Sequence, residues 1–251
     1  MAEVELVPCL SDNYAVLVHV ADETVLVDAP EPGPILATLD RRGWTLTTVL
    51  ITHHHPDHVQ ALPDVRGSAR VIGTAGEADR ISGLDETVDD GDAFSLGPIN
   101  VLAISTPGHT SGPISFHMPD EGIAFTADTL FAMGCGRLFE GTAETMWTSF
   151  QKLRRLLPDE TQIYCGHEYT ETNARFATSV LPDDPAIAAR AKTVREARAR
   201  GEPTVPTTMA LEKATNPFMR SDDPSVAAAL GMMGADPAEV FAKLRAGRDT
   251  F

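Results

Sequence analysis

The sequence predicts a mixed α/β sandwich followed by a helical region, and three observations predict it. The first two thirds of the chain hold short runs of β-branched residues separated by Gly, Pro and Asp turns. A few segments with helical spacing of apolar residues lie between these runs. After His167 the strand signals fade, and Ala, Glu, Arg and Lys fill the segments. Because strands that alternate with helices are typical of sheets covered by helices, we expect an α/β fold with a helical end.

The expected strands are short apolar runs bounded by turn residues. They cover residues 15–20, 24–28, 47–52, 100–105, 114–118, 122–127 and 162–164. A helix is predicted over residues 32–42, where apolar residues recur at helical spacing. Thr142, followed three residues later by Thr145, predicts the start of a second helix that ends near Leu157.

The last part of the chain is expected to be helical. Asp184, Asp223 and Asp236 each precede a proline. An Asp-Pro pair fits a helix N-cap followed by proline at the first helical position, where the missing N–H is not needed. We therefore expect one domain over residues 1–172 and a helical domain over residues 173–251.

Charge excludes some classes of partner. Asp and Glu outnumber Lys and Arg by 36 to 20, which gives a formal charge of −16. This charge opposes nonspecific binding to nucleic acid or to an anionic membrane, so we expect neither partner, and an anionic substrate would need a local basic patch. The N-terminus lacks a basic segment followed by an apolar run, and no segment approaches the ~20 apolar residues that span a bilayer. We expect a cytoplasmic protein.

The pattern of cysteines agrees with the reducing environment of the cytoplasm. Cys9, Cys135 and Cys165 form neither an even disulfide framework nor a CxxC pair. Each lies in an apolar or glycine-rich stretch, where a small buried residue is the expected role. A catalytic cysteine remains an alternative because histidines are plentiful.

The run from Thr52 to His58 carries most of the chemical information. It directly follows an apolar strand and holds His53, His55, Asp57 and His58. A turn that leaves a strand can direct the first two histidines to one ion and the last two side chains toward a second. Since His54 occupies the intervening position, its side chain is expected to face away.

Three further candidate ligands each follow a predicted strand: His109, Asp128 and His167. Taken together with the histidine run, they predict a dinuclear metal site. A mononuclear site that uses part of the set is the alternative. Imidazole and carboxylate ligands suit zinc, iron or manganese, and we expect two divalent ions, with zinc first.

The chain resembles the metallo-β-lactamase superfamily, whose HxHxDH motif stands here at residues 53–58. The resemblance implies an αββα sandwich with the site at one edge. It assigns His53, His55 and His109 to the first metal, Asp57, His58 and His167 to the second, and Asp128 to a bridge between them. Two ions about 3.5–4 Å apart can hold a bridging hydroxide and polarise a carbonyl, and no protein nucleophile is needed. Asp57 is expected to orient the water or pass a proton.

The superfamily motif leaves lactams, thioesters, phosphodiesters, lactones and redox chemistry open. The glycine-rich segment 130–142, which follows Asp128 and carries Arg137, narrows the choice. This segment closely resembles that of the glyoxalase II, or hydroxyacylglutathione hydrolase, family. Residues 11–14, 166–170, 216–220 and 243–251 resemble the same family.

That resemblance implies where a glutathione thioester binds. Arg137 takes the place of a loop cation that contacts the glutathione backbone, Tyr169 hydrogen-bonds it, and Arg245 and Arg248 pair with its terminal carboxylate. For these two arginines, interaction with a helix C-terminus is the structural alternative. The chain departs from many family members at Phe139, where they carry a tyrosine, so one hydroxyl that could contact substrate is absent.

The resulting hypothesis is hydrolysis of S-(2-hydroxyacyl)glutathione, typically S-D-lactoylglutathione, to glutathione and a 2-hydroxy acid, the second step of methylglyoxal detoxification. The domain over residues 1–172 would be catalytic and residues 173–251 would bind substrate, in a monomer. The alternatives are a persulfide dioxygenase-like protein, another thioester hydrolase of the fold, a lactamase, a nucleic-acid-processing enzyme and an inactive scaffold. The basic helical end argues against the first, the absence of a secretory signal against the lactamase, and the full set of ligands against the scaffold.

Overall fold

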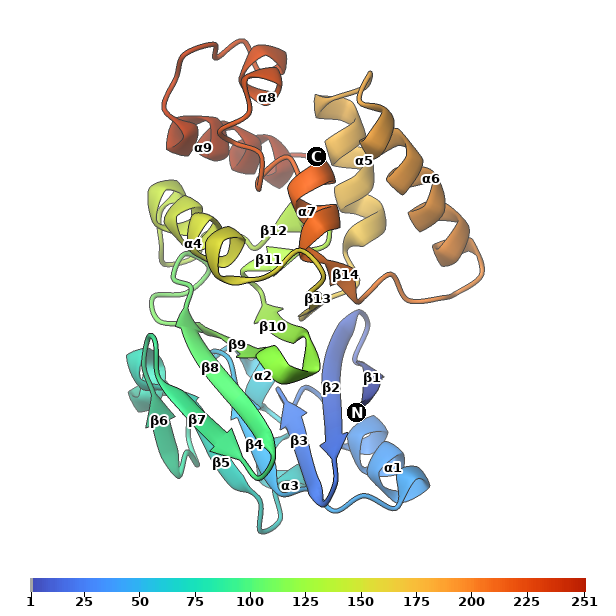
Figure 1. Ribbon diagram of the computed structural model, residues 1–251, viewed down its shortest axis with the longest axis vertical. Helices are drawn as coiled ribbons and strands as arrows, with labels where there is room; N and C mark the ends of the chain where they lie inside the picture. Colours follow the sequence, from blue (N-terminus) through green and yellow to red (C-terminus); the bar gives the residue numbers. More distant parts are fainter. Residues whose placement is uncertain (1) are drawn as a thin grey trace. The chain divides into compact units, whose positions relative to one another are not determined.

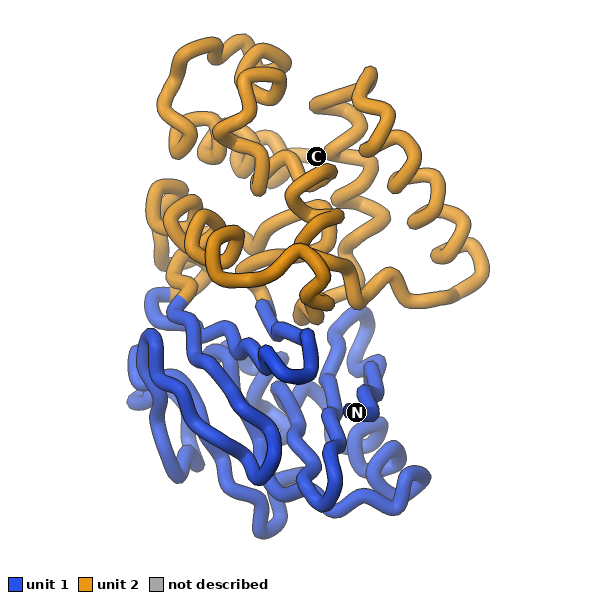
Figure 2. The backbone as a smooth tube through the Cα atoms, viewed as in Figure 1, with its two compact units in different colours: residues 1–105, 111–127 blue, residues 106–110, 128–251 orange. Residues whose placement is uncertain are grey.

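The computed structural model describes residues 2–251, drawn in Figure 1. Within this range the chain divides into two compact units, shown in different colours in Figure 2. Unit 1 comprises the chain up to Ser105 together with Ser111–Ala127, and unit 2 comprises Thr106–Thr110 and Asp128–Phe251. The expected boundary between two domains at residue 172 is not tested by this division and stays a prediction.

Unit 1 contains a six-stranded sheet whose strands lie in chain order. The strands are β1 (Glu3–Cys9), β2 (Asn13–Val20), β3 (Glu23–Val27), β4 (Thr48–Ile51), β5 (Arg70–Thr74) and β6 (Glu86–Val88). The pairs β1–β2 and β2–β3 are antiparallel, whereas β3, β4, β5 and β6 run parallel. Parallel neighbours need a crossover, and α1 (Pro32–Arg42), the predicted first helix, supplies the one between β3 and β4.

Four antiparallel strands of unit 1 form a second layer of strands, in the order β10-β9-β8-β7. They are β7 (Ala93–Leu96), β8 (Ile99–Ser105), β9 (Ile114–Met118) and β10 (Ile123–Ala127). Every residue of β9 and β10 is buried. Short helical segments connect the strands of this unit: α2 (Pro56–Val59), α3 (Leu62–Val65), η1 (Ala75–Arg80) and η2 (Pro119–Glu121).

The core of unit 1 is aliphatic. Leu17, Leu26, Val49 and Ile51 from the sheet pack with Ile35 of α1, and all five side chains are fully buried. Burying a side chain of this size contributes about 1.5–3 kcal/mol. The strand order and this core fix where β4 ends, and the histidine run follows that end.

Unit 2 is mainly helical. It holds α4 (Ala143–Leu156), α5 (Thr170–Val180), α6 (Pro185–Ala199), α7 (Met209–Thr215), α8 (Pro224–Ala229) and α9 (Pro237–Asp249). Two small antiparallel pairs accompany them, β11 (Leu130–Phe131) with β12 (Gly134–Cys135) and β13 (Gln162–Cys165) with β14 (Thr207–Thr208). Phe241 packs edge-to-face against Phe150 and Phe218, with ring centroids 5.3 Å apart in each pair.

The predicted helix starts are confirmed. Thr142 caps α4 by accepting a hydrogen bond from the Thr145 N–H. Asp184, Asp223 and Asp236 cap α6, α8 and α9 in the same way, each with proline at the first helical position. No helix in the described part of the chain is long and apolar enough to cross a membrane.

Candidate metal centre

The histidine run lies in the turn between β4 and α2. Ile51 ends β4, His55 is the N-cap of α2, and Pro56 begins that helix. Asp57 and His58 therefore stand in the first helical turn. The ring centroid of His53 lies 4.2 Å from that of His58 and 4.8 Å from that of His55. The three imidazoles therefore form a cluster of nitrogen donors of the kind that a metal ion takes.

A buried carboxylate fixes the orientation of His58. Asp28, directly after β3, places Oδ2 2.7 Å from Nδ1 of His58. It also accepts the N–H and the hydroxyl of Thr52, at 2.9 and 2.8 Å. Since an ionised carboxylate only accepts, Nδ1 of His58 carries the proton, and Nε2 is left with the lone pair that a metal needs.

The same chain of hydrogen bonds reaches His53. Thr52 gives its single hydroxyl proton to Asp28, so its Oγ1 accepts from Nδ1 of His53, 3.1 Å away. Nε2 of His53 is therefore also the unprotonated nitrogen. Asp28 thus fixes the protonated nitrogen of two candidate ligands, of His58 directly and of His53 through Thr52. Acceptors of this kind are expected behind metal-binding histidines.

His54 has a different role. Its backbone N–H and its Nδ1 both contact Oε2 of Glu77, at 2.8 and 2.6 Å. The Glu77 side chain is fully buried, and its other oxygen accepts the N–H of Gly112 at 2.9 Å. His54 therefore ties the ligand turn to η1, as expected for the one histidine of the run that was not assigned to a metal.

Asp57 is held from β2. The side-chain amide of Asn13 donates to the backbone carbonyl and to Oδ2 of Asp57, both at 3.1 Å. The Asp57 carboxylate lies 3.9 Å from Nε2 of His58 and is 40% exposed. Asp57 is therefore partly open to solvent, as is His55.

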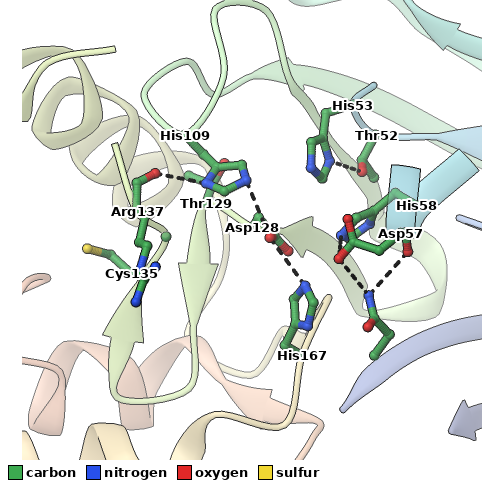
Figure 3. A network of polar contacts seen from close by, with 12 residues as sticks. Thr52, His53, Asp57, His58, His109, Asp128, Thr129, Cys135, Arg137 and His167 are labelled. Atoms are coloured by element: carbon green, nitrogen blue, oxygen red, sulfur yellow. Dashed lines mark hydrogen bonds and ion pairs between the residues drawn. The ribbon is translucent and has the colours of Figure 1, made fainter. Parts of the chain in front are cut away.

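Unit 2 brings its own three candidate ligands together, as the dashed lines in Figure 3 show. Oδ2 of Asp128 lies 3.4 Å from Nε2 of His109 and 3.3 Å from Nε2 of His167. Nδ1 of His109 donates to the carbonyl of Arg137 at 2.8 Å, so its Nε2 is the unprotonated nitrogen that faces the carboxylate. One carboxylate oxygen thus stands between two imidazole nitrogens.

Two glycines permit this close packing. Gly108, next to His109, has a φ of +146°, and a Cβ there would lie 2.7 Å from the side chain of Met146. A Cβ on Gly136 would lie 1.8 Å from the carbonyl oxygen of Asp128. Only glycine allows the backbone to approach so closely at either position.

The candidate substrate-binding arginines lie near the end of α9. Arg137 is exposed, and its Nε is 4.0 Å from Oδ1 of Asp249. Arg248 donates from Nε to Oδ1 of Asn173 at 3.2 Å. Burial, together with the positive charges of Arg245 and Arg137, lowers the pKa of Arg248 from its ordinary value. Asp249, which lies near Arg137 and Arg245, offsets part of the repulsion among the three cations.

Arg245 differs from the other two because it is 95% buried, with an exposed fraction of 5%. Its Nη1 donates to the carbonyl of Cys135 at 2.7 Å, and its Nη2 contacts Asp249 at 3.0 Å. Its guanidinium also lies over the ring of Phe218, 5.5 Å from the centroid. This arginine supports the β11–β12 hairpin as well as adding charge.

The two candidate aromatic residues touch candidate ligands. The Phe139 side chain is 62% exposed, and its ring contacts that of His109 edge-on at 5.2 Å. The ring of Tyr169 stacks on that of His167, with centroids 4.7 Å apart. Both rings therefore border candidate ligands of unit 2.

The cysteines do not supply a nucleophile. Burial raises the pKa of Cys9 and of Cys135 to about 11 and that of Cys165 to about 12. All three thiols are buried and stay protonated near neutral pH. The alternative of a catalytic cysteine is therefore disfavoured.

Comparison with known proteins identifies the family. The model of the metallo-beta-lactamase superfamily matches residues 10–75 and 66–167, a span that includes every candidate ligand. The model of the hydroxyacylglutathione hydrolase C-terminus matches residues 168–251. A protein of Ruegeria pomeroyi named hydroxyacylglutathione hydrolase is 54% identical, over 99% of each chain. One of the same name from Rhizobium meliloti is 51% identical, over 99% of this chain and 98% of that protein.

The chain belongs to the hydroxyacylglutathione hydrolase family. It is a hydrolase of the metallo-beta-lactamase superfamily, and the predicted family and class of enzyme are confirmed.

Solved structures agree with the fold of this family. ETHE1 from Myxococcus xanthus has a TM-score of 0.65 at 26% identity, with 99% of both chains covered. The B3 metallo-beta-lactamase BLEG-1 has a TM-score of 0.66 at 21% identity, over 86% of this chain and 99% of that one. The expected metallo-β-lactamase fold with a helical C-terminal region is therefore confirmed.

Asn13 and Asp28, which orient candidate ligands, were not predicted, and neither was Glu77, which holds the turn through His54. Asn13 stands in a segment that resembles the family, but nothing in its spacing pointed to Asp57. Asp28 looked like a residue that ends a strand. A polar residue that follows a strand next to the one carrying the histidine run is the signal that could have identified it.

Proposed function

We propose that this chain hydrolyses S-(2-hydroxyacyl)glutathione, typically S-D-lactoylglutathione, to glutathione and a 2-hydroxy acid, as the second step of methylglyoxal detoxification. The observation that carries the proposal is the 54% identity, over 99% of the chain, to a protein named hydroxyacylglutathione hydrolase. We assign the catalytic domain to residues 1–172 and the substrate-binding domain to residues 173–251. The monomeric state and the cytoplasmic location stay predictions.

The proposed metal centre holds two divalent ions and uses all seven candidate ligands. Three groups of residues offer the imidazole and carboxylate atoms that a divalent ion takes: His53, His55 and His109; His53, His58 and Asp128; Asp57, His58 and His167. We assign the first group to one ion and the last to the second, with Asp128 bridging. The position of Asp128 Oδ2 between the Nε2 atoms of His109 and His167 supports a bridge, because one carboxylate can serve two ions.

The donor set fits such ions. His53, His58 and His109 each donate from Nδ1 to an acceptor, which leaves Nε2 as the ligand atom. Nitrogen and carboxylate ligands suit zinc first, with iron and manganese as alternatives. The acceptor behind each ring also raises the basicity of the ligand and fixes its direction.

Two bound divalent ions would lower the pKa of a water molecule and polarise the thioester carbonyl. Asp57 accepts a proton from that water, and Asn13 keeps its carboxylate in place. The water oxygen bonds to the thioester carbon, and the C–S bond breaks. The sulfur leaves as a thiolate and takes up one of the water protons, while the other is released from the carboxylic acid.

The arginines near the end of α9 supply the local positive charge that an acidic protein needs to bind an anion. We assign Arg245 and Arg248 to the glycine carboxylate of glutathione, Arg137 to its backbone and Tyr169 to a hydrogen bond with it. Since Arg245 already donates to Cys135 and Asp249, Arg248 is the more accessible partner of the two. Phe139 can offer only apolar contact.

The test is steady-state hydrolysis of S-D-lactoylglutathione, with metal content measured on the same sample. A thioester of N-acetylcysteamine serves as the substrate without glutathione. Glutathione-selective turnover with nearly two ions per chain is the expected result. A fully metallated sample without thioesterase activity would refute the substrate assignment and favour a persulfide dioxygenase-like protein or another hydrolase of the fold.

A further inference from the structure

The β11–β12 hairpin connects two of the proposed ligands. It begins at Leu130, two residues after Asp128, and it ends at Cys135, two residues before Arg137, whose carbonyl accepts from Nδ1 of His109. The hydrogen bond from the Gly136 N–H to the Thr129 carbonyl, 3.1 Å long, closes it. Whatever fixes this hairpin also fixes the direction of the Asp128 carboxylate and of the His109 ring.

The tip of the hairpin is strained. Met133 has a φ of +57°, in the left-handed region that a bulky side chain rarely adopts, and it is fully buried. Such a conformation is strained and persists only where the surroundings hold it in place. The Met133 N–H donates to Oε2 of Glu212, 2.9 Å away on α7.

Side chains of the helices bind the other polar groups of the hairpin. Asn216 donates to the carbonyls of Phe131 and Gly134, at 3.2 and 2.9 Å. Asn173 on α5 donates to the carbonyl of Ala132 at 3.1 Å. The hairpin therefore depends on α5 and the end of α7 for its backbone hydrogen bonds, rather than on a larger sheet.

Glu212 stands at the centre of these contacts. It is fully buried, and four donors surround its carboxylate. Arg190 and Thr207 donate to Oε1, while Met133 and Asn216 donate to Oε2. An amide at this position would turn an NH₂ group toward other donors, so the site requires a carboxylate. The buried pair of Glu212 with Arg190 need not add to the stability of the fold, because removing two charges from water is costly. A role in fixing one conformation is the alternative.

We propose that Glu212 is a positioning residue of the metal centre. It holds Met133 in its left-handed conformation, and through the hairpin it keeps Asp128 and His109 aligned for their ions. This inference rests on the metal assignment of the proposed function. It makes the helical region part of the metal centre as well as of the substrate site.

The test compares Glu212→Gln with the matched control Asp184→Asn. Both change a carboxylate of the helical region that pairs with an arginine, but Asp184 contacts Arg220 and the start of α6 instead of the hairpin. Each protein is titrated with Zn²⁺ and, separately, with Co²⁺, whose visible absorption reports coordination geometry. Thermal unfolding and the separate kcat and KM for S-D-lactoylglutathione are measured on the same samples.

We expect Glu212→Gln to weaken metal binding about 10- to 100-fold and to change the Co²⁺ spectrum, because outer hydrogen bonds of this kind set ligand geometry. Its kcat should fall while KM stays unchanged. Asp184→Asn should lower the Tm and leave the spectrum and the metal affinity as in the wild type. If Glu212→Gln fails to fold, Glu212→Asp keeps the charge but shortens its reach to Met133, and it should show the same changes on a smaller scale.

A folded Glu212 variant with wild-type metal affinity and Co²⁺ spectrum overturns the inference and leaves Glu212 a purely structural residue. If the wild-type protein binds two ions but hydrolyses no thioester, the substrate assignment is refuted. The metal titrations then still test the role of Glu212. A wild-type protein that binds neither Zn²⁺ nor Co²⁺ refutes the metal centre and this inference together.

Discussion

At the scale of single residues, the candidate site depends on which nitrogen of each histidine carries a proton. Asp28 and the carbonyl of Arg137 settle this for His58 and His109, and both acceptors lie far from their partners in the sequence. The histidine run could be predicted because its spacing is local. Asp28 could not, because its role follows from the parallel register that pairs Val27 with Leu50. A sequence pattern does not contain that register.

Asp128 gives the sharpest prediction for a single ligand. We expect Asp128→Ala to abolish thioester hydrolysis, because the proposed bridge between two ions is lost. The metal content per chain should fall below that of the wild type, measured by atomic emission on the sample used for kinetics. Full activity in this variant would refute the dinuclear mechanism and favour a site that uses part of the ligand set.

Arg248 gives a prediction for binding rather than chemistry. We expect Arg248→Ala to raise KM about 10- to 100-fold, the range that a hydrogen bond to a charged group of about 1.5–3 kcal/mol supplies. The kcat should stay the same if Arg248 contributes equally to substrate and transition-state binding. Lys243→Ala, an exposed change on the same helix, is the control. An unchanged KM would show that Arg248 does not hold the glutathione carboxylate.

At the scale of elements, prediction succeeded where capping or periodicity is strong. Residues 32–42 and 114–118 form α1 and β9 with the bounds that were expected. The strands of two residues, β11, β12 and β14, are too short to show any periodicity. β1, β5, β6 and β7 were also missed. In β1, Pro8 near the end of the strand is atypical of a strand.

The start of α6 and the start of α8 share one cation, Arg220. Its Nη1 lies 2.7 Å from Asp184 and its Nη2 lies 2.9 Å from Asp223. Burial acts to raise the pKa of both aspartates, but hydrogen bonds, including those from Arg220, lower it below the usual value of 3.8. The stabilisation is therefore complete above that value, and it is lost as the pH falls through the lower pKa of the folded state.

We expect Arg220→Met to lower the free energy of unfolding by about 1–3 kcal/mol at neutral pH, because two carboxylates lose a charged hydrogen-bond donor. The difference from the wild type should shrink in acid, below the usual aspartate pKa, where the wild type loses the same contacts. Urea unfolding at neutral and acidic pH measures both effects. Arg200→Met, which removes an exposed pair with Glu202, should change neither value. A constant difference between the two pH values would contradict this account of Arg220.

At the scale of the whole molecule, the net charge of −16 contrasts with the three arginines gathered near the end of α9. Composition alone could predict that an anionic substrate needs a basic patch. It could not predict that Arg245 would be buried against Cys135, because that contact joins residues 110 positions apart in the chain. The three arginines were predicted from the resemblance to a family, and the structure shows which groups each of them contacts.

Metal removal tests the molecule as a whole. Ions that bind only the folded chain stabilise it by about 4 kcal/mol when free ion stands about 1,000-fold above its Kd. For a chain of this size that corresponds to roughly 10 °C in Tm. We therefore expect a chelator to abolish turnover and lower the Tm by several degrees, with both restored by Zn²⁺, as followed by calorimetry. Identical Tm values with and without chelator would contradict the proposed metal centre.

The three buried cysteines have a practical consequence for an enzyme that releases a thiol. Their protonated, shielded sulfurs do not compete with product glutathione for a chromogenic disulfide reagent, so the folded protein should add no background to a continuous thiol assay. Any slow reaction of the protein with that reagent then reports opening of the chain. Cys9 lies in β1 and Cys135 lies in the hairpin. The rate at which the reagent modifies each cysteine therefore measures how often that element opens.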